Sequence, residues 1–163
     1  MEEKYYELTD EFKVNVFGIK LFRIKCTRKI KYANVGDLGG FVEKEDNLSG
    51  DAWVSDNAQV SGDARVYGDA WVYGDAQVYG NARVSGDADL NSNNKHCGFD
   101  CFGSANRHTH AYLTKENKVE VTCGCFRGSI EEFEKQVEKT HKGTDYEKQY
   151  KAIINVIKIK FNI

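Results

Sequence analysis

The stretch SGDARVYGDAWVYGDAQVYGNARVSGDA, residues 61–88, returns to the same six-residue phrase. An aliphatic residue falls at every sixth position from Val42 to Leu90, and from Val54 onward an alanine stands two positions before each. Residues two apart on a strand share a face, so each Ala-x-Val triplet predicts a short strand with Ala and Val pointing inward. The Gly-Asp and Gly-Asn pairs predict bends, because Gly tolerates unusual φ and Asp or Asn bonds its own backbone.

The residue between Ala and Val points outward and has a longer period of eighteen residues, or three hexads. A chain that bends three times in eighteen residues and then repeats predicts a triangular coil. Residues eighteen apart would then stack about 4.8 Å apart. The expected stacked pairs are Trp53 with Trp71, Gln59 with Gln77, and Arg65 with Arg83.

This pattern resembles the bacterial transferase hexapeptide repeat, a resemblance that implies a left-handed parallel β-helix, usually assembled into trimers. The flanks are similar to those of hexapeptide-repeat proteins of bacteriophages and prophages, which combine ELTDE, an LFRIK-like strand and GDLGGFVEKEDNLS with GDAxV hexads and a C-terminal GCFRGS segment. The hexads are specific for a fold, whereas the flanks indicate a family without indicating an activity.

The fold class that we predict is mainly β: a short left-handed parallel β-helix of about three coils, an N-terminal β-hairpin cap and a small C-terminal α+β domain. The expected boundaries are residues 1–37, 38–91 and 92–163. Alternating apolar residues on either side of Gly18 predict the hairpin, which would cover the open strand edges of the first coil.

The C-terminal region predicts a loop over residues 91–107 and a second hairpin turning at Glu116-Asn117. A capping box of Ser129 and Glu132 predicts a helix. A second helix is expected near Thr144, and the alternating tail IKIKFNI favours a strand. The inward residues expected are Ile130, Phe133 and Val137 on the first helix, and Tyr146, Tyr150, Ile153 and Ile154 on the second.

Charge is unevenly distributed, since residues 32–91 hold three Lys or Arg and eleven Asp or Glu. The N-terminus lacks the basic start and apolar run of a signal peptide, and no apolar stretch reaches the roughly 18 residues of a membrane span. We therefore expect a cytoplasmic protein, with no membrane partner and with reduced cysteines.

Acyl transfer is the first catalytic hypothesis, because the resemblance to hexapeptide acyltransferases implies a histidine acting as general base within the coils. Residues 38–91 contain no histidine. The sequence departs from the family there, so we expect no enzyme, no catalytic residue and no cofactor. The four histidines lie outside the repeat, at His96, His108, His110 and His141.

Four cysteines offer a metal hypothesis. Cys97, Cys101, Cys123 and Cys125 could present four thiolates to zinc, with a histidine replacing one of them. Their spacing differs from that of common zinc modules, so disulfides and reduced, partly buried thiols stay open as alternatives. We favour reduced thiols and no metal; Cys26, on the hairpin, is expected to be a packing residue.

The acidic bends offer a nucleic-acid hypothesis, because regularly spaced carboxylates could imitate a DNA backbone. The simpler interpretation is that Gly-Asp makes a good bend. A basic cluster at residues 20–31 is more typical of a solvated face than of a nucleic-acid site. The expected columns are Asp51, Asp69 and Asp87; Asn57 and Asp75; and Asp63 and Asn81.

Outward aromatic residues are the strongest binding candidates, because interfaces use Trp and Tyr for large apolar contact at low entropic cost. A ladder that only stiffens its own coil is the alternative. We expect Trp53 and Trp71 to form the contact between copies of a trimer. The candidate binding residues are Trp53, Trp71, Tyr67, Tyr73, Tyr79, Arg65 and Arg83.

The functional hypothesis is a non-enzymatic binding protein of phage type that acts on an unidentified host protein. The resemblance makes counter-defence a natural role, such as inhibition of a CRISPR nuclease or capture of an immune signal. A structural or assembly protein of a virion is the alternative, followed by a relative of the hexapeptide acyltransferases. Direct nucleic-acid binding is not expected.

Overall fold

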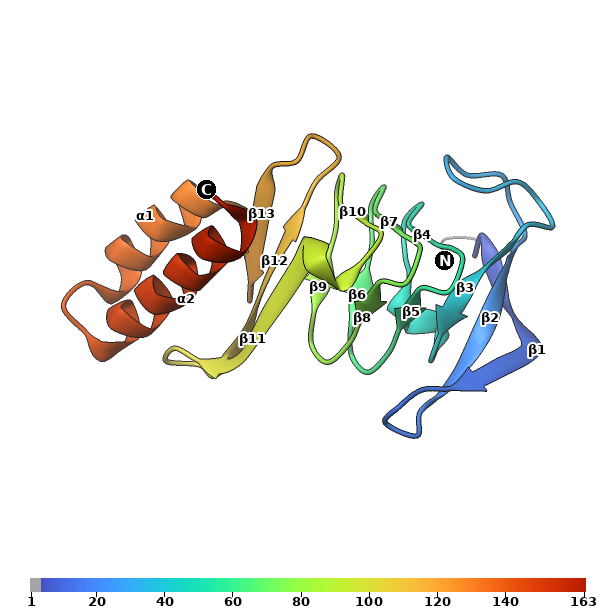
Figure 1. The fold of residues 1–163 in the computed structure, drawn as a ribbon, viewed down its shortest axis with the longest axis horizontal. Coiled ribbons are helices and arrows are strands. Elements are labelled where there is room, and N and C mark those ends of the chain that lie inside the picture. Colours follow the sequence, from blue (N-terminus) through green and yellow to red (C-terminus); the bar gives the residue numbers. More distant parts are fainter. Residues whose placement is uncertain (1–3) are drawn as a thin grey trace. The chain divides into compact units, whose positions relative to one another are not determined.

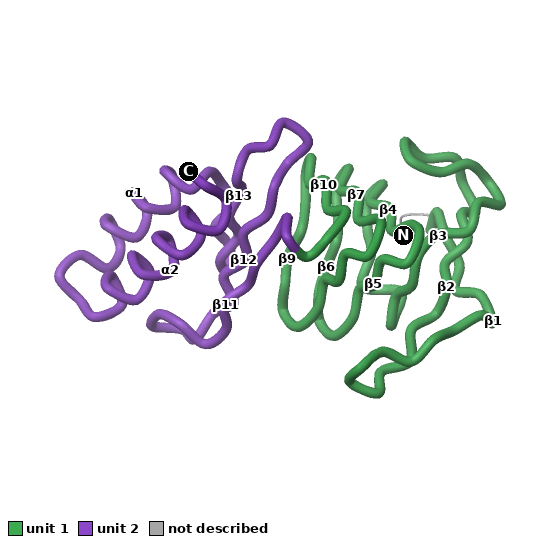
Figure 2. Tube along the Cα trace, in the orientation of Figure 1, with its two compact units in different colours: residues 1–93 green, residues 94–163 purple. Residues whose placement is uncertain are grey.

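The structure, a computed structural model, describes residues 4–163 in two compact units, unit 1 (residues 1–93) and unit 2 (residues 94–163). Figure 2 distinguishes the two units by colour. The chain is mainly β, with parallel strands in unit 1 and two helices near the C-terminus (Figure 1). No helix within residues 4–163 is long and apolar enough to cross a membrane.

Unit 1 contains seven two-residue strands, each pairing in parallel with a strand eighteen residues away. Trp53 pairs with Trp71, Gln59 with Gln77, and Arg65 with Arg83. The predicted stacking of residues eighteen apart is therefore confirmed. The strands are β4 (Trp53–Val54), β5 (Gln59–Val60), β6 (Arg65–Val66), β7 (Trp71–Val72), β8 (Gln77–Val78), β9 (Arg83–Val84) and β10 (Asp89–Leu90).

The interior of these parallel strands consists of the Ala and Val positions of the repeat. Every valine from Val54 to Val84 at this position is 0% exposed, and the alanines from Ala52 to Ala88 are buried too. The predicted inward direction is confirmed. Full burial of a valine side chain stabilises a fold by roughly 1.5–3 kcal/mol, so the repeated valines are the main apolar contribution of unit 1.

The bends between strands require a left-handed backbone. Gly68 has φ +69°, and the residue at the corresponding position of an earlier bend is Asp56, at φ 56°. A non-glycine residue is uncommon there, although Asp is among the better tolerated. The Asp56 carboxylate accepts a hydrogen bond from the Gly74 amide at 3.1 Å, which compensates for the unfavourable backbone and joins two neighbouring bends.

The N-terminal segment, by which we mean residues 4–42, begins with the predicted hairpin, whose strands β1 (Tyr6–Val14) and β2 (Lys20–Cys26) pair antiparallel. Strand β3 (Leu38–Val42) pairs antiparallel with β2 and parallel with β5, giving a five-stranded sheet in the order β1-β2-β3-β5-β8. The short 3₁₀ helix η1 (Glu45–Asn47) follows β3. The hairpin therefore continues one of the parallel sheets (Figure 1).

Gly39 and Gly40, on β3, allow this strand to pack closely against β4. A Cβ atom at Gly39 would lie 2.5 Å from Ile24 Cγ1 and 2.5 Å from the Val54 carbonyl oxygen. A Cβ atom at Gly40 would lie 2.6 Å from Val54 Cγ1. Real Cβ atoms essentially never lie so close to other atoms, so β3 can pack against β4 only because both positions lack a side chain.

Unit 2 is an antiparallel sheet with two helices. The sheet order is β11-β12-β13-β14. Its core lies between the sheet and the helices and includes Val121, Phe133, Tyr150 and Ile154. The elements are the 3₁₀ helix η2 (Asn93–Lys95), which leads into the unit, then β11 (His96–Phe102), β12 (Arg107–Leu113), β13 (Val119–Cys123), β14 (Phe126–Ser129), α1 (Ile130–His141) and α2 (Asp145–Phe161).

Several local predictions for unit 2 are confirmed. The Ser129 hydroxyl accepts from the Glu132 amide at 3.2 Å, and the Glu132 carboxylate accepts from the Ser129 amide at 2.8 Å, which is the capping box. The β12–β13 hairpin turns at Glu116-Asn117, where Asn117 has φ 56°. The residues predicted to face inward from α1 are buried: Ile130, Phe133 and Val137.

Three local predictions are wrong. The predicted loop contains β11, whose backbone pairs with β12 although few of its side chains are buried. The C-terminal tail is helical, because α2 continues and buries Ile157 on the same face as Ile153. Tyr146, predicted to point inward, is exposed at the start of α2.

Candidate interaction surfaces

The outward side chains of the three parallel sheets in unit 1 differ in what covers them. We define the tryptophan column as Trp53 and Trp71, on β4 and β7. Trp53 is only 2% exposed. Trp71 lies between two aromatic rings, stacked on Tyr32 at 5.0 Å and on Tyr73 at 4.0 Å between ring centroids. The prediction of two exposed, stacked indoles is therefore wrong for Trp53.

The N-terminal segment is the physical reason for this burial. Gly39 allows close approach to the Trp53 ring, since a Cβ at Gly39 would lie 2.8 Å from Trp53 Cζ2. The Tyr5 hydroxyl donates to the Ala52 carbonyl at 2.5 Å. The Trp71 indole N–H donates to the Ser55 hydroxyl at 3.1 Å. Within residues 4–163, the tryptophan column is thus engaged by the chain itself, and Trp53 cannot be a contact between copies.

The same segment pairs with two acidic bends. Arg28 lies 2.9 Å from the Asp51 carboxylate, and Lys31 Nζ lies 3.8 Å from the Asp69 carboxylate. Two of the three carboxylates in this predicted column therefore have a cation beside them. A DNA-like surface needs unneutralised charge, so these pairs favour the simpler interpretation of the acidic bends.

Cations of the hairpin also have local partners. Arg23 pairs with Glu11 at 2.9 Å, and Lys25 lies 3.8 Å from Glu7. Lys20 Nζ lies 3.8 Å from the centre of the Phe12 ring. Exposed pairs of this kind contribute roughly 0–1 kcal/mol each, so they fit a solvated charged face, as predicted.

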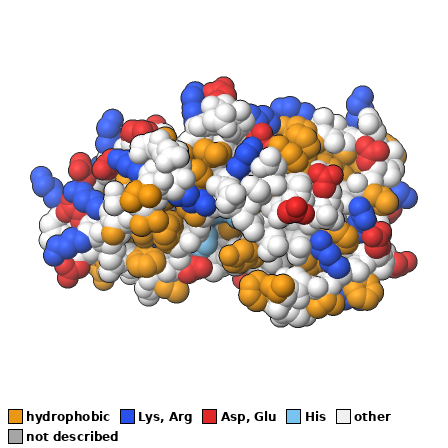
Figure 3. All heavy atoms as spheres, viewed as in Figure 1, with side chains coloured by type: hydrophobic (Ala, Val, Ile, Leu, Met, Phe, Trp, Pro, Cys, Tyr) orange, Lys and Arg blue, Asp and Glu red, His pale blue; other side chains and the backbone are white. Residues whose placement is uncertain are grey.

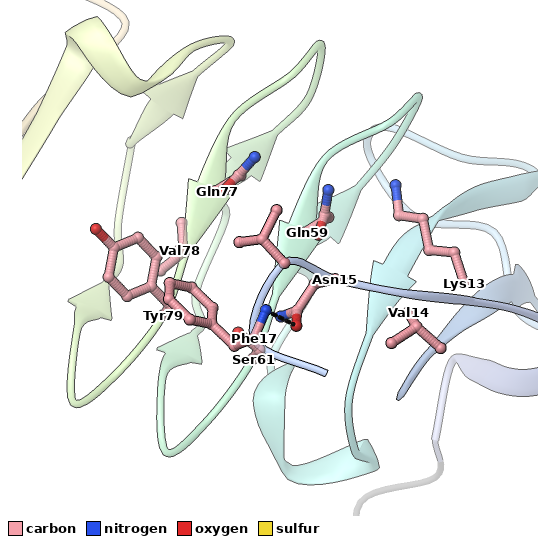
Figure 4. A pocket seen from close by; sticks show the side chains of 10 residues that line it. Lys13, Val14, Asn15, Phe17, Gln59, Ser61, Gln77, Val78 and Tyr79 are labelled. Carbon is pink, nitrogen blue, oxygen red and sulfur yellow. Dashed lines mark hydrogen bonds between the residues drawn. The ribbon is translucent and has the colours of Figure 1, made fainter. Parts of the chain in front are cut away.

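The tip of the β1–β2 hairpin carries exposed apolar side chains that sequence reasoning overlooked. We define the hairpin-tip patch as Val14, Val16, Phe17 and Tyr79. Val16 is 90% exposed, Phe17 68% and Tyr79 53%. In Figure 4 the tip lies beside β5 and β8, with the Phe17 and Tyr79 rings next to each other. Their centroids are 6.2 Å apart.

The hairpin tip is held by its own side chain. The Asn15 carboxamide oxygen accepts from the Phe17 and Ile19 amides, both at 2.9 Å. Gln59 and Gln77 line a small cavity of about 160 Å³ behind the tip (Figure 4). The exposed side chains are therefore presented on an ordered turn.

A second surface lies on the strands that carry the arginines. We define the arginine groove as a cavity of about 350 Å³ along β6 and β9. Arg65 and Arg83 are paired in register and exposed. Tyr67, at the end of β6, is half-buried. The groove is lined by Lys44, Asp46, Asp63, Arg65, Asn81 and Arg83.

Local contacts explain how the groove is built. Asn47 is buried and donates to the Ala64 carbonyl at 2.8 Å, directly below Arg65 in the stack. Lys44 Nζ lies 2.8 Å from the Asp63 carboxylate, which raises the pKa of Lys44 and lowers the pKa of Asp63. Among residues 4–163, the Arg65 guanidinium makes no hydrogen bond or ion pair, although its charge adds a smaller lowering effect to the pKa of Asp63.

The repeat is similar to a known family. The family described as YdcK Beta solenoid repeat matches residues 58–74 and 76–88. The match covers β5 to β9 and agrees with the observed parallel pairing. No curated protein matches the chain. The match and the parallel pairing together fit a β-solenoid repeat.

The cysteines of unit 2 lie in different environments. Cys123 is buried and accepts a hydrogen bond from the Thr109 hydroxyl at 3.3 Å. Burial raises the pKa of Cys97 to about 11. Cys101 and Cys125 are exposed, and all five cysteines of the chain are free thiols. In the described part of the chain, no group of three or more metal-ligating side chains is brought together.

The histidines of β11 and β12 form contacts that the spacing did not reveal. His96 Nδ1 lies 2.9 Å from His110 Nε2, and His108 Nδ1 lies 2.6 Å from the Asp100 carboxylate. Burial, with a smaller effect of Lys160, lowers the pKa of His96 to about 4. His96 is therefore neutral at pH 7. The register of β11 against β12 brings these residues together, and this proximity could not be read from their spacing in the sequence.

Proposed function

We propose that this chain is a non-enzymatic binding protein. Its repeat is proposed to be a left-handed parallel β-helix of about three coils that holds two binding surfaces in fixed positions. The parallel pairing at eighteen residues and the similarity to β-solenoid repeats support the solenoid. The host-cell setting and a counter-defence role rest on the resemblance of the flanks to phage and prophage proteins.

The hairpin-tip patch is the observation that carries this proposal. Large apolar side chains on an exposed turn are unfavourable in water unless another surface covers them. Aromatic residues dominate the binding energy of protein interfaces, and preorganised turns lose little entropy on binding. Phe17 meets both conditions, because the Asn15 side chain orders its turn, and the ring of Tyr79, which follows β8, lies beside the Phe17 ring. The partner that fits this patch best is a protein with an apolar pocket.

Figure 3 shows exposed hydrophobic side chains along the lower edge of unit 1, among scattered charged ones. Of the candidate binding residues, Tyr79 belongs to the hairpin-tip patch, and Arg65 and Arg83 to the arginine groove. Tyr73 is engaged with Trp71. The binding role proposed here therefore uses Tyr79 and the tip residues, and no longer Trp53.

A trimer is the proposed assembly, because a three-sided solenoid favours a closed ring of three copies. The contact has to use side chains other than Trp53, which is buried within one chain. Light scattering should give about three times the 18.5 kDa mass of the chain. A monomer at micromolar concentration would contradict this part of the proposal.

The experiment is affinity capture from the host cell followed by reconstitution with the purified partner. The double variant Phe17→Ser, Tyr79→Ser should remain folded, since both side chains are exposed, and should bind the partner at least about a hundredfold more weakly. The matched control is Ile159→Ser on α2, which removes an exposed apolar side chain of unit 2. Equal loss in the control, or unchanged binding in the double variant, would refute the role of the patch.

A further inference from the structure

The arginine groove places two like charges side by side. Arg65 on β6 and Arg83 on β9 are paired in register on parallel strands, and neighbouring strands lie about 4.8 Å apart. Like charges directly opposite each other on adjacent strands are destabilising. Both side chains are exposed on the same cavity. An anion lying between the guanidinium groups would gain a favourable interaction with each of them, in addition to the interactions that Arg65 has with Asp63 and that Arg83 has within the chain.

A third cation lines the same cavity. Lys44 Nζ bonds to the Asp63 carboxylate at 2.8 Å, and an ammonium group has three donors, so two remain. Within residues 4–163 the Arg65 guanidinium makes no hydrogen bond or ion pair, although its charge acts on the Asp63 carboxylate. Arginine binds phosphate and carboxylate oxygens through two parallel N–H groups, and lysine adds a point charge. Three cations around one cavity therefore match a compact anion with several oxygens.

The other side chains of the groove limit the kind of anion. Asp46 and Asp63 bring negative charge to the same cavity, so a long polyanion lying along it would be repelled. Carboxylates and the Asn81 carboxamide are good acceptors for hydroxyl groups. A ligand with one phosphate and several hydroxyls can satisfy both kinds of side chain.

We propose that the arginine groove is a binding site for a small phosphorylated polyol, such as a sugar phosphate or the ribose phosphate of a nucleotide. The phosphate would lie between Arg65 and Arg83 and receive a further hydrogen bond from Lys44. The hydroxyls would donate to Asp63 and Asp46. The volume of about 350 Å³ lies within the range of small-molecule sites, roughly 300–1,000 Å³.

This site is separate from the hairpin-tip patch, since no residue lines both cavities. If the arginine groove bound no ligand, the proposed binding of a protein at the hairpin-tip patch would still stand. If the patch bound no protein, the proposed ligand site would still stand. The two surfaces can be tested by different variants of the same chain.

The test is isothermal titration of the full chain at low salt with inorganic phosphate, glucose 6-phosphate, adenosine monophosphate, glucose and citrate. Glucose 6-phosphate or the nucleotide should bind at least about tenfold more tightly than phosphate or glucose alone, because only they supply both groups. Preference between the two distinguishes a sugar phosphate from a nucleotide. Binding should weaken with added salt, as expected for exposed charges.

Variants connect binding to the groove. Arg65→Gln should weaken binding of the phosphorylated ligand by about tenfold or more, and Arg65→Lys should lie between it and the unmodified protein, because it keeps the charge without the paired donors. Lys148→Gln, in the exposed part of α2, removes one positive charge elsewhere and should change nothing. The ligand should also raise the melting temperature of the unmodified protein and not that of Arg65→Gln.

The proposal is overturned by any of three results: no binding of a phosphorylated polyol at millimolar concentration, equal affinity of the Arg65→Gln variant, or equal affinity for citrate. Tight binding of a DNA or RNA oligonucleotide without binding of the small phosphates would also overturn it. The acidic residues of the groove would then not repel a long polyanion. Circular dichroism of Arg65→Gln shows that a loss of binding is not a loss of fold.

Discussion

The tryptophan column and the arginine groove occupy the same position of the repeat, yet one is covered and the other is open. Trp53 and Arg65 both stand between an inward Ala and an inward Val. Trp53 is buried beneath the N-terminal segment, whereas Arg65 is exposed on a cavity. The repeat therefore determines the direction of a side chain, while the segments outside the repeat determine its burial.

The largest expected effect comes from disrupting the valine interior that lies beneath both the tryptophan column and the arginine groove. Val72 is 0% exposed in the interior of unit 1. Val72→Asp would bury an unpaired carboxylate, so we expect a loss of at least about 4 kcal/mol in the free energy of unfolding, measured by urea denaturation. Gln77→Asp, at an outward position, is the control and should cost less than about 1 kcal/mol. Equal stability of the two variants would show that the inward register is wrong.

The next effect separates the two columns. Trp53→Ala should cost about 3–5 kcal/mol, because it removes a large buried ring and leaves a cavity beneath the N-terminal segment. Trp71→Ala should cost less, since Trp71 is only part-buried. Light scattering should show no change of mass for Trp53→Ala under conditions where it stays folded. A change of mass with unchanged stability would restore Trp53 as a contact between copies.

A smaller effect tests the close approach that buries the tryptophan. Gly39→Ala would place a Cβ 2.5 Å from both Ile24 Cγ1 and the Val54 carbonyl, and overpacking of this kind typically costs about 1–3 kcal/mol. Leu38→Ala at the neighbouring, exposed position should cost less than about 1 kcal/mol. The fluorescence of the tryptophans should shift towards that of exposed indole in Gly39→Ala only. Identical thermal melts for the two variants would contradict the packing described for β3 and β4.

The smallest expected effect concerns Arg65, which is exposed on the arginine groove. Arg65→Gln should change the free energy of unfolding by less than about 0.5 kcal/mol, because the side chain is exposed. The change combines loss of the favourable interaction between Arg65 and Asp63 with relief of the repulsion from Arg83, so its size should fall as salt is added. Urea denaturation at two salt concentrations measures it. A loss above about 1 kcal/mol would mean that Arg65 supports the fold.

The elements that sequence analysis predicted best are those with a local cause. The valine period defined the interior of unit 1, and the capping box defined the start of α1, because each depends on residues close in the chain. Strand β11 was missed because its side chains show little alternation and its existence depends on pairing with β12. The tail was misjudged because IKIK alternates as a strand would, while Ile153 and Ile157 also share one face of a helix.

The residues of the candidate sites likewise fall into those that the sequence predicted and those that it did not. The sequence singled out Arg65, Arg83 and Tyr79 as outward residues, and the structure shows them exposed. It did not single out Phe17, Val16 or Lys44, although three apolar residues around a turn were a usable signal. Lys44 lines the same cavity as Arg65 because Asn47 accepts from the Lys44 amide and donates to the Ala64 carbonyl beside β6.

The stacking at eighteen residues and the inward positions follow from the sequence alone, because strand alternation and bends are set by neighbouring residues. The burial of Trp53, the exposure of the hairpin tip beside Tyr79, and the position of Lys44 and Arg65 on one cavity come from the tertiary structure. Each of these depends on where a non-repeating segment lies against the solenoid. That placement is a sum of contacts between residues far apart in the chain, and no local pattern encodes it.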